Sequence, residues 1–342
     1  MKDNYSAWEI HPKDFYRQKS LTDKIRFLLR FAILAPSSHN SQPWKFTILD
    51  DALFLSPDQN RFLPISDPTN RHLYIALGCV IENFCIAADY YGLTSVLQYF
   101  PSEFSDATVK ILLHSPSLSA SSSKSDDHPI FSILKRRSNR NIYEDRIPQP
   151  EILEGFKKMA YEKSSICFVT DHAQKIAIAR FLVDWREKEF DNKEFRREMA
   201  RYKRNNFTRS YIGMPGFTMG FKNFASILAP LAIRYFNVIR PIKMKEIRLL
   251  TDHTPVFGVI TSPDNTEHSW LQVGRSLEKI WIEAEQQKLQ LSINALPASV
   301  DELQRIIGIS ERPQIFFRLG YAAHTPPHSP RLGIERVFEG SR

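Results

Sequence analysis

The sequence repeats itself at a fixed offset, and an internal repeat constrains a fold more strongly than any short motif. Residues 77–101 align without gaps with residues 273–297, an offset of 196 positions. Apolar residues recur three and four apart through both stretches, which predicts two long buried helices. The identities are Gly78 with Gly274, Glu82 with Glu278, Ile86 with Ile282, Ala88 with Ala284, Leu93 with Leu289 and Pro101 with Pro297. Identities this frequent at one offset favour a duplicated unit over a chance match of two amphipathic helices.

The flanking residues extend the repeat to a larger unit. Each helix follows a short β-branched or aromatic run that ends in Ser-Pro-Asp, at 52–58 and 257–264. Each precedes a further apolar run, at 109–113 and 314–321. We therefore expect both halves to form a strand, a turn, a long helix, a short extended piece and a second strand.

A Ser-rich segment separates the halves. Residues 115–128 lack a hydrophobic period, which is typical of a surface linker. The N-terminal half is then about 1–114 and the C-terminal half 129–342. The second half carries extra sequence at about 184–250 that is rich in Arg, Lys and aromatic residues. This insertion could be a lid, a specificity wall, a plug or an ordinary helical excursion over the seam, and the sequence leaves these possibilities open.

Charge and composition restrict the partners. The formal net charge of +8 favours anionic small molecules, phosphates or nucleic acid as partners, and the three cysteines show no metal or disulfide spacing. The N-terminus has no apolar signal segment, and the longest apolar stretch, 224–239, is interrupted by Pro230 and Arg234. That stretch is too short to span a bilayer, so a buried or interfacial helix is expected there. We expect a soluble, cytoplasmic chain with no metal, no membrane partner and, since no RNA-binding signature is present, no nucleic-acid partner.

The first motif, AILAPSSHNSQPWKF, occupies residues 32–46. Upstream, residues 21–34 have helical period with Thr22 or Asp23 as a candidate N-cap, and Pro36 ends that helix. A polar turn follows, and then the strand KFTIL. A turn this rich in small hydrogen-bonding residues can present several donors and acceptors to a planar heterocycle, although Ser and Asn also occur in ordinary turns.

The second motif, KRRSNRNIYEDRIPQPEILEGF, places four cations around one hydroxyl. These residues are Lys135, Arg136, Arg137, Ser138 and Arg140. Arginine forms bidentate, charge-assisted hydrogen bonds with phosphate oxygens, so this cluster suits a phosphate. A solvated basic loop is the alternative. Pro148, Pro150 and Glu151 then open a new helix.

Taken together, APSSHNSQPW after a helix and RRSNRNIY before a proline-led helix resemble the two segments that contact flavin mononucleotide (FMN) in the nitroreductase family. The C-terminal LGYAAHTPPHSPRLGIERVF, 319–338, resembles the closing strand and loop of that family. Each motif occurs in one half only: HPKDFYRQKS and AYEKSSICFVTD stand at the corresponding places of the other halves. This arrangement is similar to the Acg-type branch of the family. It implies an α+β, nitroreductase-like fold duplicated in one chain, with two mixed or antiparallel sheets, flanked by helices, forming a pseudo-dimer.

The resemblance implies one complete FMN site and one site that has lost its function. The phosphate is assigned to Arg136, Ser138 and Arg140, completed by Arg331, with Arg137 and Asn139 beside them. The ribityl chain and ring edge are assigned to Pro36, Ser37, Ser38, Asn40 and Gln42. Backbone N–H groups near the reactive ring atoms are assigned to Asn294, Ala295 and Leu296. No catalytic side chain is expected, because the flavin ring carries the redox chemistry.

The activity implied is hydride transfer from NADH or NADPH to FMN and then to an unidentified electron-poor acceptor, such as a nitroaromatic or a quinone. The chain would act as a monomer, an intramolecular pseudo-dimer. The chief alternative is a protein that sequesters FMN with little or no NAD(P)H turnover, and a more distant one is a basic nucleic-acid-associated protein. The equivalent Glu82 and Glu278 are expected to be paired structural charges rather than acid–base groups.

Overall fold

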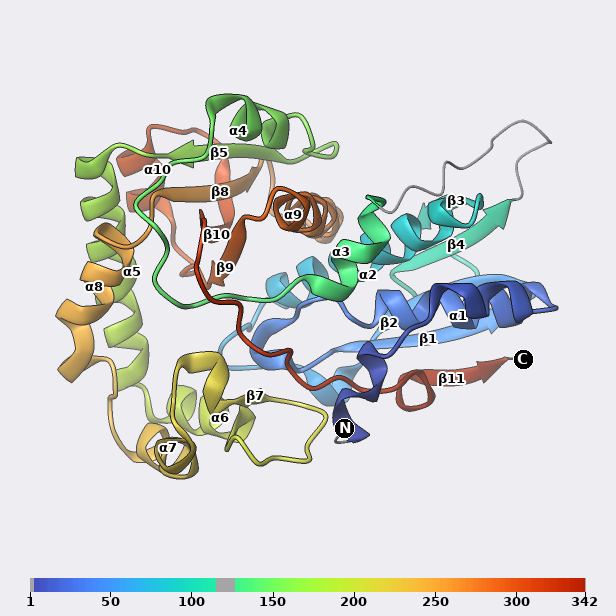
Figure 1. Ribbon diagram of the computed structural model, residues 1–342, viewed down its shortest axis with the longest axis horizontal. Helices are drawn as coiled ribbons and strands as arrows, with labels where there is room; N and C mark the ends of the chain where they lie inside the picture. Colours follow the sequence, from blue (N-terminus) through green and yellow to red (C-terminus); the bar gives the residue numbers. More distant parts are fainter. Residues whose placement is uncertain (1–2, 115–126, 342) are drawn as a thin grey trace.

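The computed structural model describes residues 3–114 and 127–341, so almost all of the predicted linker, 115–128, lies outside the described residues. The described chain forms two main sheets and one small two-stranded ladder, and helices cover the sheets (Figure 1). The predicted α+β class with mixed and antiparallel sheets is confirmed.

The N-terminal sheet contains β1 (Trp44–Leu49), β2 (Ala52–Pro57), β3 (Thr94–Tyr99), β4 (Val109–His114) and β11 (Phe338–Ser341). Its strand order is β11-β1-β2-β4-β3. All neighbours pair antiparallel except β11, which runs parallel to β1. Because β11 is the last strand of the chain, the end of the second half completes the sheet of the first half (Figure 1).

The C-terminal sheet contains β5 (Ser165–Val169), β8 (Val256–Ser262), β9 (Gln290–Asn294) and β10 (Arg312–Gly320). Its order, β5-β8-β10-β9, is antiparallel throughout. The order matches β1-β2-β4-β3 strand for strand. In both sheets the short strand after the long helix takes the edge, and the strand after it lies inside the sheet, as the repeat predicts.

The two long helices pack directly against each other at the centre of the molecule (Figure 1). Helix α2 (Arg71–Tyr90) and helix α9 (Glu267–Gln286) have the same length of 20 residues. A Cβ added to Gly78 would lie 2.2 Å from the carbonyl oxygen of Leu271, and one added to Gly274 would lie 2.0 Å from that of Ile75. The glycine pair found in the sequence repeat is therefore where the two backbones approach most closely, because only glycine leaves room for that contact.

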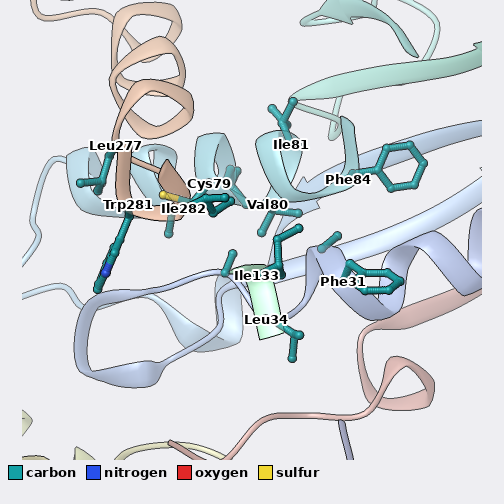
Figure 2. Close-up of a cluster of buried hydrophobic side chains, with 14 of the residues drawn as sticks. Phe31, Leu34, Cys79, Val80, Ile81, Phe84, Ile133, Leu277, Trp281 and Ile282 are labelled. Atoms are coloured by element: carbon teal, nitrogen blue, oxygen red, sulfur yellow. The ribbon is translucent and has the colours of Figure 1, made fainter. Parts of the chain in front are cut away.

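The core at this crossing draws on both halves. Figure 2 shows side chains of α1 (Leu21–Ala32), α2, α3 (Pro129–Lys135) and α9 gathered into one cluster, including Phe31, Val80, Ile133 and Trp281. These side chains belong to one buried hydrophobic cluster that spans the two sheets. Burial of about 25 cal/mol for each Å² of apolar surface makes such a cluster the main force that joins the halves.

The insertion forms a separate helical layer. It follows α4 (Pro150–Lys157) and lies between β5 and β8, with α10 (Asp301–Ile307) near its inner side. Its elements are α5 (His172–Asp191), α6 (Lys193–Tyr202), β6 (Lys203–Arg204), β7 (Met214–Pro215), α7 (Asn223–Tyr235) and α8 (Lys243–Thr251). Helix α5 packs on α8, and α6 packs on α7. The helix expected within 224–239 is confirmed as α7.

The start of α1 differs from the sequence prediction. The prediction of Thr22 or Asp23 as N-cap is wrong, because Ser20 is the N-cap and its Oγ accepts a hydrogen bond from the Asp23 N–H (3.0 Å). Ser20 Oγ also donates to the Asp23 carboxylate (2.7 Å), so the two residues form a reciprocal cap that fixes the first turn.

One helix of the described residues, α2, is long and apolar enough to cross a membrane by composition. Most of that helix is buried inside the fold. Its apolar surface is satisfied by α9 and by the N-terminal sheet, so it serves as a core helix.

Candidate functional site

The turn after α1 holds an unusual backbone. His39, Asn40 and Gln42 have φ values of 55°, 56° and 55°, the left-handed region that non-glycine residues rarely adopt. Each such residue costs of the order of 1 kcal/mol and persists only where its surroundings enforce it. Strain of this kind gathers at ligand sites, so the Pro36–Gln42 turn is a candidate site on geometry alone.

Contacts from distant segments enforce this strained turn. Asn40 is buried, and its Nδ2 donates to the carbonyl groups of Gly213 (3.1 Å) and Pro330 (2.9 Å). The Gly213 N–H in turn donates to the Asn40 carbonyl (3.2 Å). Gln42 is also buried; its Nε2 donates to the Tyr211 carbonyl (2.8 Å). The insertion therefore lies directly on the turn, and the side chains of Asn40 and Gln42 are occupied by holding it there.

The remaining residues of the turn are less constrained. Pro36, Ser37 and Ser38 are each partly exposed. Ser37 Oγ accepts a hydrogen bond from the Gln42 N–H (2.9 Å), which closes the turn. The Ser38 hydroxyl has no hydrogen-bond partner among the described residues, and Ser38 lines a small cavity of about 10 Å³. Among the described residues of the turn, Ser37 and Ser38 are thus the side chains best placed to meet a ligand.

Arg136 of the basic segment reaches the end of α1. Its Nη2 donates to the Leu34 carbonyl (2.7 Å), two residues before the turn begins. Its Nε lies 3.0 Å from Glu278 Oε1, outside hydrogen-bond geometry, and its guanidinium stacks 4.4 Å from the centre of the Trp281 ring. The basic segment and the turn therefore meet, as the proposed cross-half site requires. Arg136 is buried there as an ion pair.

Arg331 joins the same place from the C-terminal loop. It is buried, and its Nη2 donates to the carbonyl groups of Leu34 and Ala35 (both 3.3 Å), while its Nη1 donates to Asn40 Oδ1. Burial, followed by repulsion from Arg136, lowers the pKa of Arg331 to about 9. No carboxylate forms an ion pair with Arg331 within the described residues, because Glu278 is taken by Arg136. The region thus holds a buried positive charge without a full partner.

Several polar atoms in this region are buried with no hydrogen-bond partner among the described residues. They are Ser138 Oγ, His328 Nδ1, the two carboxylate oxygens of Glu278, and the Nε atoms of Arg136, Arg137 and Arg331. Arg137, half-buried, donates to the Pro326 carbonyl (3.1 Å). The nearby His328 has a pKa of about 3, lowered first by burial and then by Arg137, Arg331 and Arg136. Three guanidinium groups therefore act on one imidazole. Such an excess of buried positive charge is what an anion-binding site requires.

Asn139 anchors the basic segment to the C-terminal sheet by hydrogen bonds. Its side chain is buried and donates from Nδ2 to the His324 carbonyl (2.7 Å) and to Gln290 Oε1 (3.2 Å). Its N–H donates to the Leu291 carbonyl (3.0 Å), so the segment runs along the start of β9. Asn139 fixes the segment on the C-terminal sheet and has little capacity left for a ligand.

Arg140 belongs to a second group of cations. More than a third of the surface of Arg140 is accessible to solvent. The surrounding protein nevertheless lowers the pKa of its guanidinium by desolvation. Its Nη1 donates a long hydrogen bond to the Thr218 carbonyl (3.3 Å). The charges that act on it most come from Tyr143, Arg186 and Arg318, rather than from Arg136 or Arg331. The cations predicted as one clamp are therefore divided between two positions.

Lys203 of β6 lies beside Arg140. Its side chain is buried, and burial followed by repulsion from Arg140 and Arg186 lowers its pKa to about 7. Both cations also act on His39 of the turn. Its pKa is lowered to about 3, first by burial and then by repulsion from Lys203 and Arg140. Lys203 has no ion pair or side-chain hydrogen bond among the described residues. Arg140, Lys203 and the strained turn thus form a second cationic position beside the first.

The segment Asn294–Leu296 lies at the end of β9. Asn294 still pairs with Phe316 of β10, Ala295 is exposed, and Leu296 is buried. The Leu296 carbonyl accepts a hydrogen bond from Arg71 Nη2 (2.9 Å) at the start of α2. The N-terminal half therefore holds this segment, and the exposed backbone of Ala295 is its accessible part.

The two repeat-related glutamates play equivalent roles. Glu278 of α9 pairs with Arg136, and Glu82 of α2 pairs with Arg275 (3.1 Å). Glu82 also accepts a hydrogen bond from the Tyr161 hydroxyl (2.8 Å). Both carboxyl groups are buried, and burial raises their pKa values while the paired guanidinium opposes that rise. The geometry agrees with the expectation that they are structural charges.

Named proteins are similar in sequence to all or part of this chain. No protein-family model matches the chain. A protein of Mycobacterium tuberculosis named as an NAD(P)H nitroreductase, acg, is 25% identical over 337 residues, which cover 93% of this chain and 96% of that protein, and two strains give the same match. The chain is therefore similar to an Acg-type nitroreductase over nearly its full length. A second M. tuberculosis protein named as an NAD(P)H nitroreductase is 29% identical over 79 residues, 23% of each chain.

Solved structures resemble this chain over part of its length. The FMN-dependent nitroreductase NfnB of Mycobacterium smegmatis, solved with NADPH, is 18% identical and covers 62% of this chain and 96% of its own, with a TM-score of 0.42. A nitroreductase-like protein of Bacillus cereus is 13% identical, covers 61% of this chain and 92% of its own, and has a TM-score of 0.39. The sequence similarity to acg extends over nearly the full length of both chains, which these structural matches do not.

Sequence reasoning missed part of this candidate site. Lys203 stood out only as one of many basic residues in the insertion, because nothing local indicates that β6 brings it beside Arg140. Glu198 of α6 was also missed; its carboxylate accepts hydrogen bonds from the backbone of Ile65 (3.0 Å) and Ser66 (2.8 Å) and fastens the insertion to the first half. Both are non-local contacts, for which the sequence carries no spacing signal.

Proposed function

We propose that the chain is an FMN-dependent oxidoreductase that takes a hydride from NADH or NADPH and passes electrons to an electron-poor acceptor. The relatives' names support this proposal, since acg is named as an NAD(P)H nitroreductase and NfnB as an FMN-dependent one. The site supports it independently, because two cationic positions meet a strained polar turn at the junction of the halves.

The residues present fit FMN by their charges. A phosphate would form an ion pair with Arg331 and Arg137, neither of which has a salt bridge among the described residues, and it would offer acceptors to the Ser138 hydroxyl and Arg331 Nε. Arg136 would act mainly through Leu34 and Glu278, by fixing where the turn stands. The ribityl chain and ring edge are assigned to Pro36, Ser37 and Ser38, with Asn40 and Gln42 holding the turn.

The second cationic position suits a ligand edge that gains negative charge. When bound, FMN supplies the two-electron chemistry of its ring, and the protein supplies orientation and electrostatics. Lys203 and Arg140 place positive charge at one edge with little competing negative charge, so they would stabilise an electron-rich form of a group bound there. The backbone of Ala295 offers an accessible donor on the other side of the junction.

The observation that carries the proposal is the meeting of Arg136 and Arg331 with the end of α1, at 2.7 Å and 3.3 Å from carbonyl oxygens beside the turn. The test is reduction of the flavin. Purified protein should carry FMN whose visible absorbance is bleached by NADH or NADPH without air. Protein that binds no FMN, or FMN that neither nucleotide bleaches, would contradict the oxidoreductase.

A second candidate function is storage or sequestration of FMN with little turnover. It is favoured by the insertion, which lies on the turn through Gly213 and Tyr211 and is fastened to the first half by Glu198. Dithionite is small enough to reduce a covered flavin, whereas a pyridine nucleotide must stack on the ring. Bleaching by dithionite alone would therefore select sequestration over the enzyme.

We further infer that one chain suffices for the site, as an intramolecular pseudo-dimer derived from a tandem repeat, and that it is cytoplasmic. The matching strand orders and the central pair of helices support the first inference. The three free cysteines fit the second.

A further inference from the structure

Helix α7 presents a continuous apolar face to solvent. Its exposed residues are Phe224, Ile227, Leu228, Leu231 and Tyr235, spaced three and four apart, so they share one side of the helix. The exposed fraction is 76% for Phe224, 59% for Leu231 and 60% for Tyr235. Soluble surfaces scatter such residues singly, and a stripe of them marks an interaction site.

The opposite side of α7 already has its packing. Ser226, Ala229 and Ile233 are the buried residues of the helix and face α6. The apolar stripe is therefore not an unfilled part of the core. Figure 1 places α7 at the periphery of the molecule, away from both sheets, where a broad flat partner could reach it.

The charged residues in the sequence around α7 are all positive. No Asp or Glu occurs between Glu198 and Glu246, whereas Lys and Arg recur through that stretch. Lys222 and Arg234 flank the stripe, and both are exposed. Glu194 of the neighbouring α6 is paired with Arg197, and Glu187 and Asp191 of α5 are paired with Arg240. The surface is thus apolar at its centre and basic at its rim.

We propose that the outer face of α7 lies in the surface of an anionic phospholipid membrane. An amphipathic helix with bulky apolar residues on one side and cations beside them is the chemistry that binds the interface between headgroups and acyl chains. Anionic headgroups complement the basic rim. A protein partner would need acidic groups opposite Lys222 and Arg234, and a second copy of this chain packed through the same face would place basic residues against basic residues.

This mode of binding is compatible with the length of the helix. The stretch is too short to span a bilayer, which argues against insertion across it but not against a helix in the plane of the interface. Helix α7 packs on α6 and β6, and Lys203 of β6 faces the candidate site. Membrane contact would therefore bring that site close to the lipid surface, irrespective of what the site binds.

The test is co-sedimentation of the full chain with vesicles of phosphatidylglycerol and phosphatidylcholine in equal parts, against phosphatidylcholine alone. We expect binding to the anionic vesicles that is at least about tenfold tighter and weakens with added salt. The double substitution Phe224→Gln with Leu231→Gln should reduce that binding by about tenfold or more. The matched control, Ile142→Gln with Ile147→Gln, removes two comparably exposed apolar residues elsewhere and should change nothing.

A second variant separates charge from apolar contact. Lys222→Gln with Arg234→Gln should abolish the preference for anionic vesicles and leave weak residual binding. Since all four positions on α7 are exposed, circular dichroism should show unchanged folding. No binding to either vesicle, equal loss with the Ile142 and Ile147 control, or a dimer in sedimentation equilibrium that the α7 substitutions dissolve would each overturn the membrane assignment.

Discussion

The ion pair between Arg136 and Glu278 offers a quantitative test of how the halves are joined. The side chains are almost wholly buried and lie 3.0 Å apart, and Arg136 also donates to the Leu34 carbonyl. Arg136→Met would leave the Glu278 carboxylate buried without its partner. Loss of one member of a buried pair costs about 3–5 kcal/mol, much of it the desolvation of the charge left behind.

The cost should depend on pH in a defined direction. Burial already raises the pKa of Glu278 above the ordinary value of 4.5, and removal of the guanidinium raises it further. A carboxyl with a raised folded pKa loses stability as the pH rises toward that pKa, so the variant should suffer most at pH 8 and least at pH 5.5. Arg136→Met combined with Glu278→Leu removes both charges and should recover all but about 1 kcal/mol.

The assay is urea unfolding of flavin-free protein followed by far-ultraviolet circular dichroism, so that ligand binding does not contribute. Arg197→Met, which breaks the exposed pair with Glu194, is the matched control and should cost less than about 0.5 kcal/mol. The reasoning is refuted if Arg136→Met stays within about 1 kcal/mol of the wild type at pH 8, or if the double variant is no more stable than the single one.

Three further outcomes are expected. Gly274→Ala should destabilise the fold by about 3 kcal/mol or more in urea unfolding, since its Cβ would meet the Ile75 carbonyl at 2.0 Å, whereas Gly155→Ala, with open space around it, should be neutral or slightly stabilising. Arg140→Met should weaken FMN binding by about 1.5–3 kcal/mol in a fluorescence titration with no loss of stability, since its main protein contact is one long hydrogen bond. FMN affinity should fall by up to about tenfold per pH unit as the pH rises above 7, because Lys203, with a pKa near 7, then loses its charge; Lys203→Met should flatten that profile, and an unchanged profile would exclude Lys203 from the site.

The sequence predicts the parts of this fold that depend on local pattern. The offset of 196 identifies α2 and α9, their equal length and the glycine pair at their crossing, because a close approach of two helices leaves a residue-type signal. The pairing of β11 with β1 leaves no such signal, since it joins the two ends of the chain. The N-cap of α1 is missed because Ser20 stands outside the periodic segment.

The sequence predicts which residues gather near the candidate site, but it does not predict which neighbour each of them contacts. Spacing brings Arg136, Ser138 and Arg140 into one cluster, yet the backbone turns them toward different neighbours: Arg136 toward Glu278 and Arg140 toward Thr218. The left-handed backbone of His39 and Asn40 is likewise not predicted by the sequence, because the turn is made of residues common in ordinary turns. Lys203 enters through the insertion, and only the folded chain shows that it meets Arg140.

Calorimetric titration of flavin-free protein with FMN addresses the central claim directly. One intact site built from both halves requires a stoichiometry of one FMN per chain. We expect a single binding event with that stoichiometry, and it should weaken when Ser37 and Ser38 of the first half are replaced by Ala. Two FMN per chain would mean that each half keeps its own site, and the absence of binding would remove the flavin from the account altogether.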